Sequence, residues 1–229
     1  MKAHTKETQA SLTPEMAFQI LKEGNIRFAN NLKVNRNLLQ QLNETSEEQY
    51  PFAVVLSCVD SRTSAELIFD QGLGDLFSIR IAGNIVNDDI LGSMEFACKI
   101  SGAKIIVVLG HSRCGAIKGA CDNITLGNFT GLIGKLKPAV ARVREPATNR
   151  NSKNSEFVEN VARANVFQTI ANIKHRSAVL REMLENYQIA IVGGMYEIQT
   201  GMIEFYQRPE ILDCSRNKPG GLVDVVNYM

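Results

Sequence analysis

Residues 105–115 read IIVVLGHSRCG, a short run of aliphatic residues that passes directly into polar residues and glycines. A continuous apolar run of this length is typical of a strand that is covered on both faces. The residues that follow, about 113–121, predict a helix. A buried strand that leads into a helix is the repeating unit of a parallel sheet with right-handed crossovers.

The same pattern recurs along the chain. Further apolar runs predict strands at residues 52–56, 76–81 and 189–192. Helices are predicted between them at about residues 64–70 and 89–101. Residues 201–207 predict an edge strand that pairs with 189–193. We therefore expect an α/β fold with a mainly parallel central sheet, flanking helices and an antiparallel edge strand.

The N-terminal part of the chain predicts a helical arm. Residues 13–31 have apolar residues at helical spacing, Thr13 suits an N-cap, and Pro14 suits the first helical position. Residues 32–50 are polar, and we expect them to run as an extended arm over the surface. We assign residues 1–50 to the same domain as the α/β part, 51–229. Within that part we expect helices at 132–144, 157–174 and 177–187, and a turn-rich tail from residue 213.

The composition is that of an ordinary globular protein. The 229 residues include 25 Lys and Arg against 24 Asp and Glu, so the formal net charge is +1. This balance gives no general attraction to nucleic acid or to an anionic membrane. The longest apolar runs are far shorter than the roughly 18–20 residues that span a bilayer. Residues 1–12 contain no apolar segment of a signal peptide. We expect a cytoplasmic location, and leave open a trimmed signal peptide with a periplasmic location.

Cysteine and histidine are scarce, which limits the metal sites that the chain can build. The cysteines are Cys58, Cys98, Cys114, Cys121 and Cys214, and the histidines are His4, His111 and His175. An odd number of cysteines without a C-x-x-C motif disfavours a disulfide framework. Cys58, His111 and Cys114 follow two predicted strands, and the carboxyl ends of parallel strands form the binding crevice of such sheets. Zinc with three protein ligands and an open fourth position is the catalytic pattern, and four ligands make a structural site.

The remaining cysteines and histidines have simpler interpretations. Cys98 lies on an apolar helix face and is expected in the core. Cys121, seven residues after Cys114, is a weaker candidate ligand on the same helix face. We expect Cys214 and His175 to be structural or exposed, and His4 to be mobile near the terminus.

Asp60 and Arg62 lie in the turn that carries Cys58. The carboxylate can bind the metal and close the site, or it can accept a hydrogen bond from a zinc-bound hydroxide while Arg62 holds it through a bidentate pair. A plain surface ion pair is the simpler alternative.

Two thiolates cancel the charge of the zinc, so we expect a weaker Lewis acid and a more alkaline activity profile than with three imidazole ligands. Binding of Asp60 to zinc at low pH would switch activity off there.

The motifs Cys58-x-Asp60-Ser61-Arg62 and His111-x-x-Cys114-Gly115 resemble those of the β-class carbonic anhydrases. Four further segments are similar to that family, namely residues 18–29, 71–77, 81–84 and 92–97. The resemblance covers roughly residues 14–207.

The resemblance implies the β-carbonic anhydrase fold and a zinc enzyme that reversibly hydrates CO2 to bicarbonate and a proton. It implies that Cys58, His111 and Cys114 bind one Zn2+ per chain, and that Asp60 and Arg62 form a catalytic dyad. It also implies that the backbone N–H of Gly115 lies near the substrate. The family forms homodimers or larger assemblies such as tetramers, in which the first helix reaches onto the partner.

The chain also departs from the family pattern. Ala116 stands where many members have a second glycine, and the absence of Trp favours the subgroup without bicarbonate regulation. Phe69 is a candidate for lining the substrate pocket, with a place in the helix core as the alternative.

Three rival functions remain open at this point. The first is hydrolysis of carbonyl sulfide or carbon disulfide on the same zinc. The second is a silent scaffold whose structural zinc is closed by Asp60. The third is a thiol enzyme with Cys58 as nucleophile.

Overall fold

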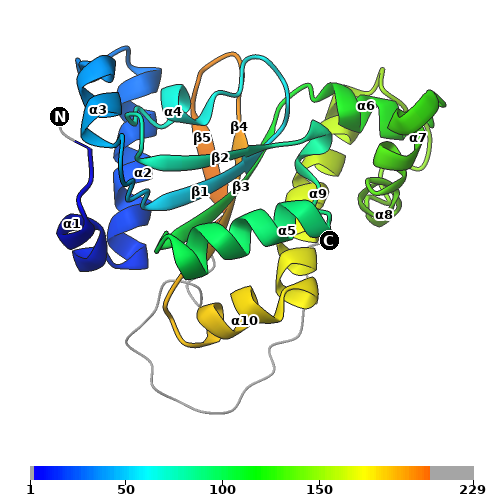
Figure 1. Ribbon diagram of the computed structural model, residues 1–229. Helices are drawn as coiled ribbons and strands as arrows, with labels where there is room; N and C mark the ends of the chain where they lie inside the picture. The colour runs from blue at the N-terminus through cyan, green and yellow to red at the C-terminus, as the bar shows by residue number, and fades with distance from the viewer. Residues whose placement is uncertain (1–2, 207–229) are drawn as a thin grey trace.

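The computed structural model describes residues 3–206, and it has a single sheet at its centre (Figure 1). The strand order is β2-β1-β3-β4-β5. The strands are β1 (Ala53–Ser57), β2 (Leu76–Arg80), β3 (Ile105–His111), β4 (Ala190–Tyr196) and β5 (Ile203–Tyr206). The first four run parallel, and β5 is antiparallel to β4. The expected fold class is confirmed. The edge strand β5 pairs with Gly193–Tyr196, so it overlaps the predicted partner segment 189–193 only at Gly193.

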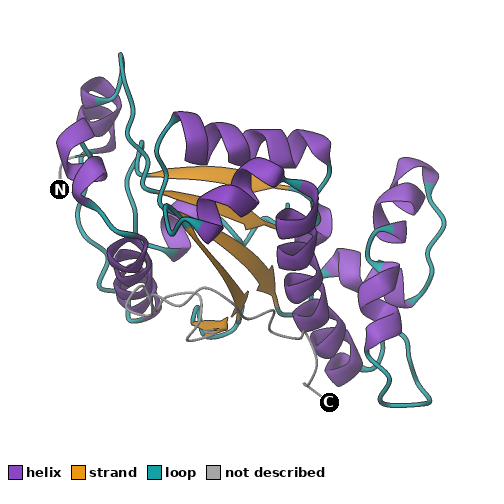
Figure 2. Ribbon diagram, turned by 90° about the horizontal axis from the view of Figure 1, so that it is seen from below, coloured by secondary structure: helices purple, strands orange, loops and turns teal. Residues whose placement is uncertain are grey.

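Helices cover both faces of the sheet (Figure 2). On one face Val55 and Val107 pack with α2 (Pro14–Ala29) and α4 (Ala65–Ile68). The opposite face packs against α5 (Asp88–Glu95), α9 (Ser155–Arg176) and α10 (Ala178–Glu185). Every residue of β1, β3 and β4 is buried, as expected from their continuous apolar runs. In β2 burial alternates instead, because β2 is an edge strand.

The N-terminal helix α2 confirms the predicted capping. The Thr13 hydroxyl accepts a hydrogen bond from the N–H of Met16 at 3.2 Å, and Pro14 occupies the first position. A short preceding helix, α1 (Lys6–Ser11), was not predicted.

The extended arm expected over 32–50 is wrong, because part of it is the helix α3 (Leu38–Glu44). The Asn37 side chain caps α3 by accepting from the N–H of Gln40 at 3.0 Å. Gln41 is buried, and its amide oxygen accepts from the N–H of Leu73 at 3.3 Å. The cap and the buried Gln41 hold α3 in place, while its apolar residues Leu38, Leu39 and Leu42 are exposed.

Between β3 and β4 the chain is helical, as expected. The helices are α6 (Gly115–Cys121), α7 (Gly127–Gly134), α8 (Lys137–Arg142), α9 and α10. Their bounds differ from the prediction: α6 and α10 are shorter than predicted and α9 is longer. The single helix predicted at 132–144 is two helices, with Pro138 in the first turn of α8. The helix predicted at 89–101 is α5 followed by a π-helical turn, Phe96–Ile100.

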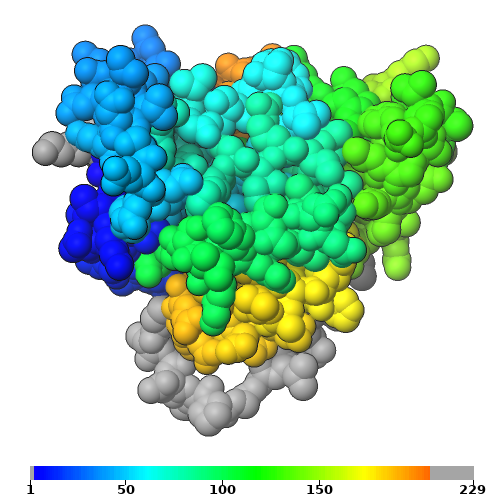
Figure 3. All heavy atoms as spheres, in the orientation of Figure 1, coloured from blue at the N-terminus to red at the C-terminus, as the bar shows by residue number. Residues whose placement is uncertain are grey.

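Helices lie at both ends of the molecule, on either side of the central sheet. Figure 3 shows the N-terminal helices at one end and α7 with α8 at the other. The predicted tail from residue 213, including Cys214, lies outside the described residues. Among the helices of residues 3–206, none has the length and apolar character needed to cross a membrane.

Candidate metal centre

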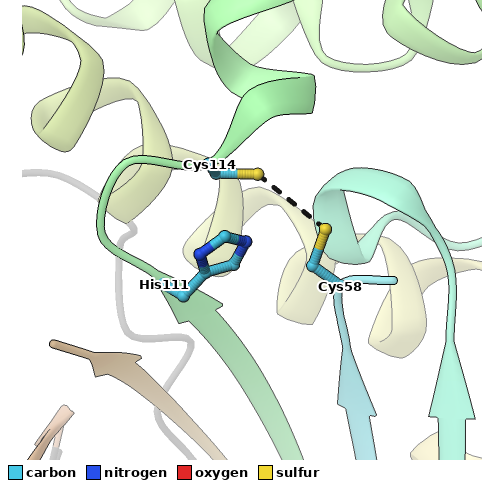
Figure 4. Close-up of side chains that lie close together, drawn as sticks. All are labelled: Cys58, His111 and Cys114. Carbon is cyan, nitrogen blue, oxygen red and sulfur yellow. Dashed lines mark hydrogen bonds between the residues drawn. The ribbon is translucent and has the colours of Figure 1, made fainter. Parts of the chain in front are cut away.

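Cys58, His111 and Cys114 meet at the carboxyl edge of the sheet, as predicted (Figure 4). Cys58 directly follows β1, His111 ends β3, and Cys114 is the N-cap of α6. Their potential ligand atoms all lie within 4.8 Å of one another, and all three residues are buried. Two adjacent strands and one helix start therefore bring residues far apart in the sequence to one point.

The geometry of the two sulfurs fits a tetrahedral metal ion. The Sγ atoms of Cys58 and Cys114 lie 3.9 Å apart. Two sulfurs bound at about 2.3 Å to a tetrahedral zinc lie about 3.8 Å apart. The pair can therefore hold such an ion without rearrangement.

The imidazole of His111 is already oriented for a metal. Its Nδ1 lies 2.9 Å from the carbonyl oxygen of Ser112, which can only accept, so Nδ1 carries the proton and Nε2 a lone pair. Nε2 is buried and has no hydrogen-bond partner. A buried polar atom without a partner is costly, and a metal ion would satisfy this one. The donor set of two sulfurs and one nitrogen is one that zinc accepts.

The two thiols share one hydrogen bond, which separates their acidities. The bond from Cys114 lowers the pKa of Cys58, and the N–H of Gly83 also donates to the Cys58 sulfur at 3.4 Å. The same bond and burial raise the pKa of Cys114. The pair therefore favours one thiolate at Cys58, and a metal ion would have to displace the proton of Cys114.

The Asp60 carboxylate lies in the fork of the Arg62 guanidinium. Arg62 Nε donates to Oδ1 at 2.9 Å and Nη2 donates to Oδ2 at 2.8 Å. These bonds hold the pKa of Asp60 well below its usual range. Within residues 3–206 the group of potential metal ligands contains Cys58, His111 and Cys114 but not Asp60. In this arrangement Arg62, and not the metal position, is the partner of Asp60.

Sequence reasoning missed the residues that support the Cys58 loop. Arg80, at the end of β2, donates from Nε to the carbonyl oxygen of Cys58 at 3.1 Å and from Nη2 to that of Asp60 at 2.5 Å. The Thr63 hydroxyl donates to the Cys58 carbonyl at 2.9 Å. Arg80 stands at the carboxyl end of the neighbouring strand, but nothing in its spacing indicates that it bonds to these carbonyls. These bonds fix the backbone that carries Cys58 and Asp60.

The loop between His111 and Cys114 is held in a similar way. The Ser112 hydroxyl donates to Glu197 Oε1 at 2.9 Å, and the Arg113 N–H donates to Glu159 Oε1 at 2.9 Å. Arg113 adopts a φ of 59°, a left-handed conformation that a non-glycine residue needs such support to keep. Both carboxylates come from distant elements and could not be paired with this loop from spacing alone.

The structure also places the other residues that the sequence singled out. Gly115 begins α6, is exposed, and has open space where a Cβ would lie.

Cys98 and Cys121 are buried outside the ligand group, and His175 is exposed. The His4 ring packs edge-on against the Phe52 ring, with 5.2 Å between the ring centroids. Phe69 is fully buried and stacks on Phe205, which favours its place in the core.

The family model for carbonic anhydrase matches residues 53–203 of this chain. One similar curated relative is carbonic anhydrase 2 of Mycobacterium tuberculosis, 35% identical over 189 residues. The alignment covers 82% of this chain and 90% of the relative.

Solved structures show the same fold. The β-carbonic anhydrase CcaA superposes with a TM-score of 0.65 at 25% identity, covering 82% of this chain and 84% of that one. One of two tetrameric β-carbonic anhydrases from Sordaria macrospora superposes with a TM-score of 0.67 at 24% identity, covering 82% of this chain and 95% of that one.

Proposed function

The chain belongs to the β-carbonic anhydrase family, and we propose that Cys58, His111 and Cys114 hold one zinc ion with which this carbonic anhydrase reversibly hydrates CO2 to bicarbonate and a proton. The observation that carries the proposal is the buried Nε2 of His111, which has no hydrogen-bond partner and belongs to the same compact group as the two sulfurs. When bound, zinc supplies a Lewis acid that lowers the pKa of water, to about 7 in the three-histidine carbonic anhydrases.

Asp60 and Arg62 orient the reacting water in this proposal. Because Arg62 occupies both carboxylate oxygens from one side, Asp60 stays ionised and keeps lone pairs that can accept a proton donor. An acceptor two residues beyond Cys58 can fix the direction of the water's O–H bond, so that the oxygen lone pair faces CO2. While Arg62 holds its carboxylate, Asp60 would not be available as a further ligand to a bound metal ion.

Gly115 is proposed to lie beside the substrate. It begins α6 directly after the ligand Cys114, and no side chain fills the space next to its Cα. A carboxylate-like product can approach the backbone N–H there without steric hindrance.

We further propose that the enzyme is a homo-oligomer, a dimer or a tetramer, and that residues 1–50 belong to the same domain as the catalytic part. The tetrameric relative from Sordaria macrospora supports an assembly. Apolar side chains on α2 and α3 are exposed, among them Met16, Ile26, Leu38, Leu39 and Leu42. A single domain is supported by Asp70, which pairs with Arg27 of α2 and with Arg36 at 2.6 and 2.5 Å.

The direct test combines zinc analysis with stopped-flow CO2 hydration on the purified enzyme. We expect one zinc per chain and hydration that disappears when a chelator removes the metal and returns with zinc. Full hydration without metal would contradict the zinc proposal. One zinc per chain without hydration at any pH would instead favour a silent scaffold. Side-by-side turnover of CO2 and CS2 tests the substrate.

A further inference from the structure

We propose that Asn165 on α9 is a positioning residue for the Cys58 thiolate, acting through the turn that contains Gly83. The inference rests on the proposed function, since it requires Cys58 to bind zinc. Asn165 does not touch the metal group, and its effect passes through one backbone segment.

The Gly83 turn links the two residues. Gly83 lies in a 3-10 turn, Ala82–Asn84, with a φ of 71°, which favours glycine. A Cβ at Gly83 would come within 3.0 Å of Leu136. In this conformation the Gly83 N–H donates to Cys58 Sγ at 3.4 Å, so the turn presents a backbone donor to the proposed metal ligand.

Two buried polar residues of α9 hold this turn from the other side. Asn165 Nδ2 donates to the Gly83 carbonyl at 2.8 Å, and the Thr169 hydroxyl donates to the Asn84 carbonyl at 3.2 Å. Asn165 and Thr169 are one helical turn apart and are 1% and 2% exposed. Their neighbours on the buried face of α9 are the apolar Val161, Ala162, Val166 and Ile173.

Packing alone does not require these polar residues. An apolar side chain would fill the same face, but it would leave the carbonyls of the Gly83 turn without the donors that Asn165 and Thr169 supply. The bond of Asn165 fixes the orientation of the Gly83–Asn84 peptide, and the φ of Gly83 then sets the direction of its own N–H. Asn165 thereby keeps a donor directed at Cys58 Sγ.

An N–H donor at a thiolate has two chemical consequences. It fixes the direction of the sulfur, and it withdraws part of the negative charge that the sulfur would donate to the metal. With two thiolates in the site, that charge governs how strong a Lewis acid the zinc remains. Outer contacts of this kind typically change metal affinity by about 10- to 100-fold when removed.

The test compares Asn165→Leu with a matched control, Asn25→Leu. Asn25 is also buried, and its Nδ2 donates to the carbonyls of Ile68 and Gly201 at 3.2 and 2.8 Å. It lies on α2, which covers the opposite face of the sheet. Both substitutions remove donors from backbone carbonyls, and that at Asn25 also removes the acceptor of the Ile203 N–H at 2.8 Å. Only the substitution at Asn165 affects the Gly83 turn. Asn165→Ser is the second variant if the leucine variant does not fold.

Zinc affinity is measured by competition with a chromophoric chelator, and the thiolate-to-metal charge-transfer band is recorded after loading with Co2+. We expect the Asn165 variant to bind zinc about tenfold more weakly and to show a shifted band. We expect the Asn25 variant to lose stability while both readouts stay as in the wild type. Unchanged affinity and band in the Asn165 variants, or equal losses in the Asn25 variant, would overturn the inference. A wild type without a thiolate band would instead overturn the zinc proposal itself.

Discussion

Arg62 holds both carboxylate oxygens of Asp60, at 2.9 Å from Nε and 2.8 Å from Nη2, two residues beyond Cys58. The guanidinium is half exposed whereas the carboxylate is mostly covered, so the pair directs Asp60 inward. Arg62 also donates its backbone N–H to the same carboxylate at 3.0 Å. These three hydrogen bonds from Arg62 keep the Asp60 carboxylate charged and separate from the proposed metal ligands.

Asp60→Asn is expected to lower CO2 hydration about 100-fold or more while zinc content stays at one per chain. The amide keeps the size of the side chain but loses the negative charge that accepts a hydrogen bond from the water and pairs with Arg62. Stopped-flow hydration and metal analysis on the same sample measure both quantities. Unchanged hydration would remove Asp60 and Arg62 from the mechanism.

Cys114→Ser is expected to lose zinc during dialysis, because a hydroxyl is a much weaker zinc ligand than a thiolate. Cys121→Ser is the control, since Cys121 is also a buried free cysteine nearby in the chain but lies outside the ligand group. Mass-spectrometric metal analysis should give about one zinc per chain for the control only. Retention of zinc by the Cys114 variant would contradict the ligand assignment.

The activity should rise toward alkaline pH. Two thiolates neutralise the zinc, so water at the metal should titrate above the pKa of about 7 found with three imidazole ligands. Titration of Asp60 does not cause this rise in activity. Its pKa is lowered, so the carboxylate is ionised over the whole pH range in which the activity rises. A hydration rate that is flat from mildly acid to alkaline pH would count against this explanation.

Asp70→Asn should destabilise the fold by about 3 kcal/mol at neutral pH. Burial alone would raise the pKa of Asp70, but hydrogen bonds from Arg27, Arg36 and the Val34 N–H outweigh it and lower the pKa. The stabilisation is therefore present above the unfolded pKa of about 3.9 and is lost as pH falls through the lower folded pKa.

Urea unfolding of the Asp70 variant and the wild type at several pH values measures this difference, which should shrink below about pH 3.9. Asp88→Asn is the control. Asp88 pairs with Arg176 at 2.7 Å but is 96% exposed, so its loss should cost under about 1 kcal/mol. If the two substitutions lowered the free energy of unfolding equally at neutral pH, the ion pairs of Asp70 with Arg27 and Arg36 would not be what stabilises the N-terminal part of the fold.

The strands and the ligand group were predictable because their signals are local. Continuous apolar runs mark β1 and β3, and Cys58 and His111 directly follow or end them. Parallel neighbours place such ends together without further information. The sequence therefore sufficed to predict the Cys58, His111 and Cys114 group.

The supporting residues were not predictable, because they reach the site through backbone atoms. Arg80 and Asn165 bond to carbonyls of the Cys58 loop and of the Gly83 turn, and no residue spacing encodes such a contact. The helix α3 was missed for a related reason. It depends on the Asn37 cap and on the buried Gln41, whose amide oxygen accepts from the distant Leu73 N–H, and its leucines are exposed instead of forming a buried stripe.

X-ray absorption at the zinc edge tests the central claim most directly, because it counts the sulfur atoms around the metal. The zinc-loaded enzyme should show two sulfur scatterers at about 2.3 Å and the remaining ligands as nitrogen or oxygen. Cys58→Ser and Cys114→Ser should each remove a sulfur or the metal altogether. A spectrum without sulfur, or with more than two sulfurs, would contradict a zinc site built from Cys58, His111 and Cys114.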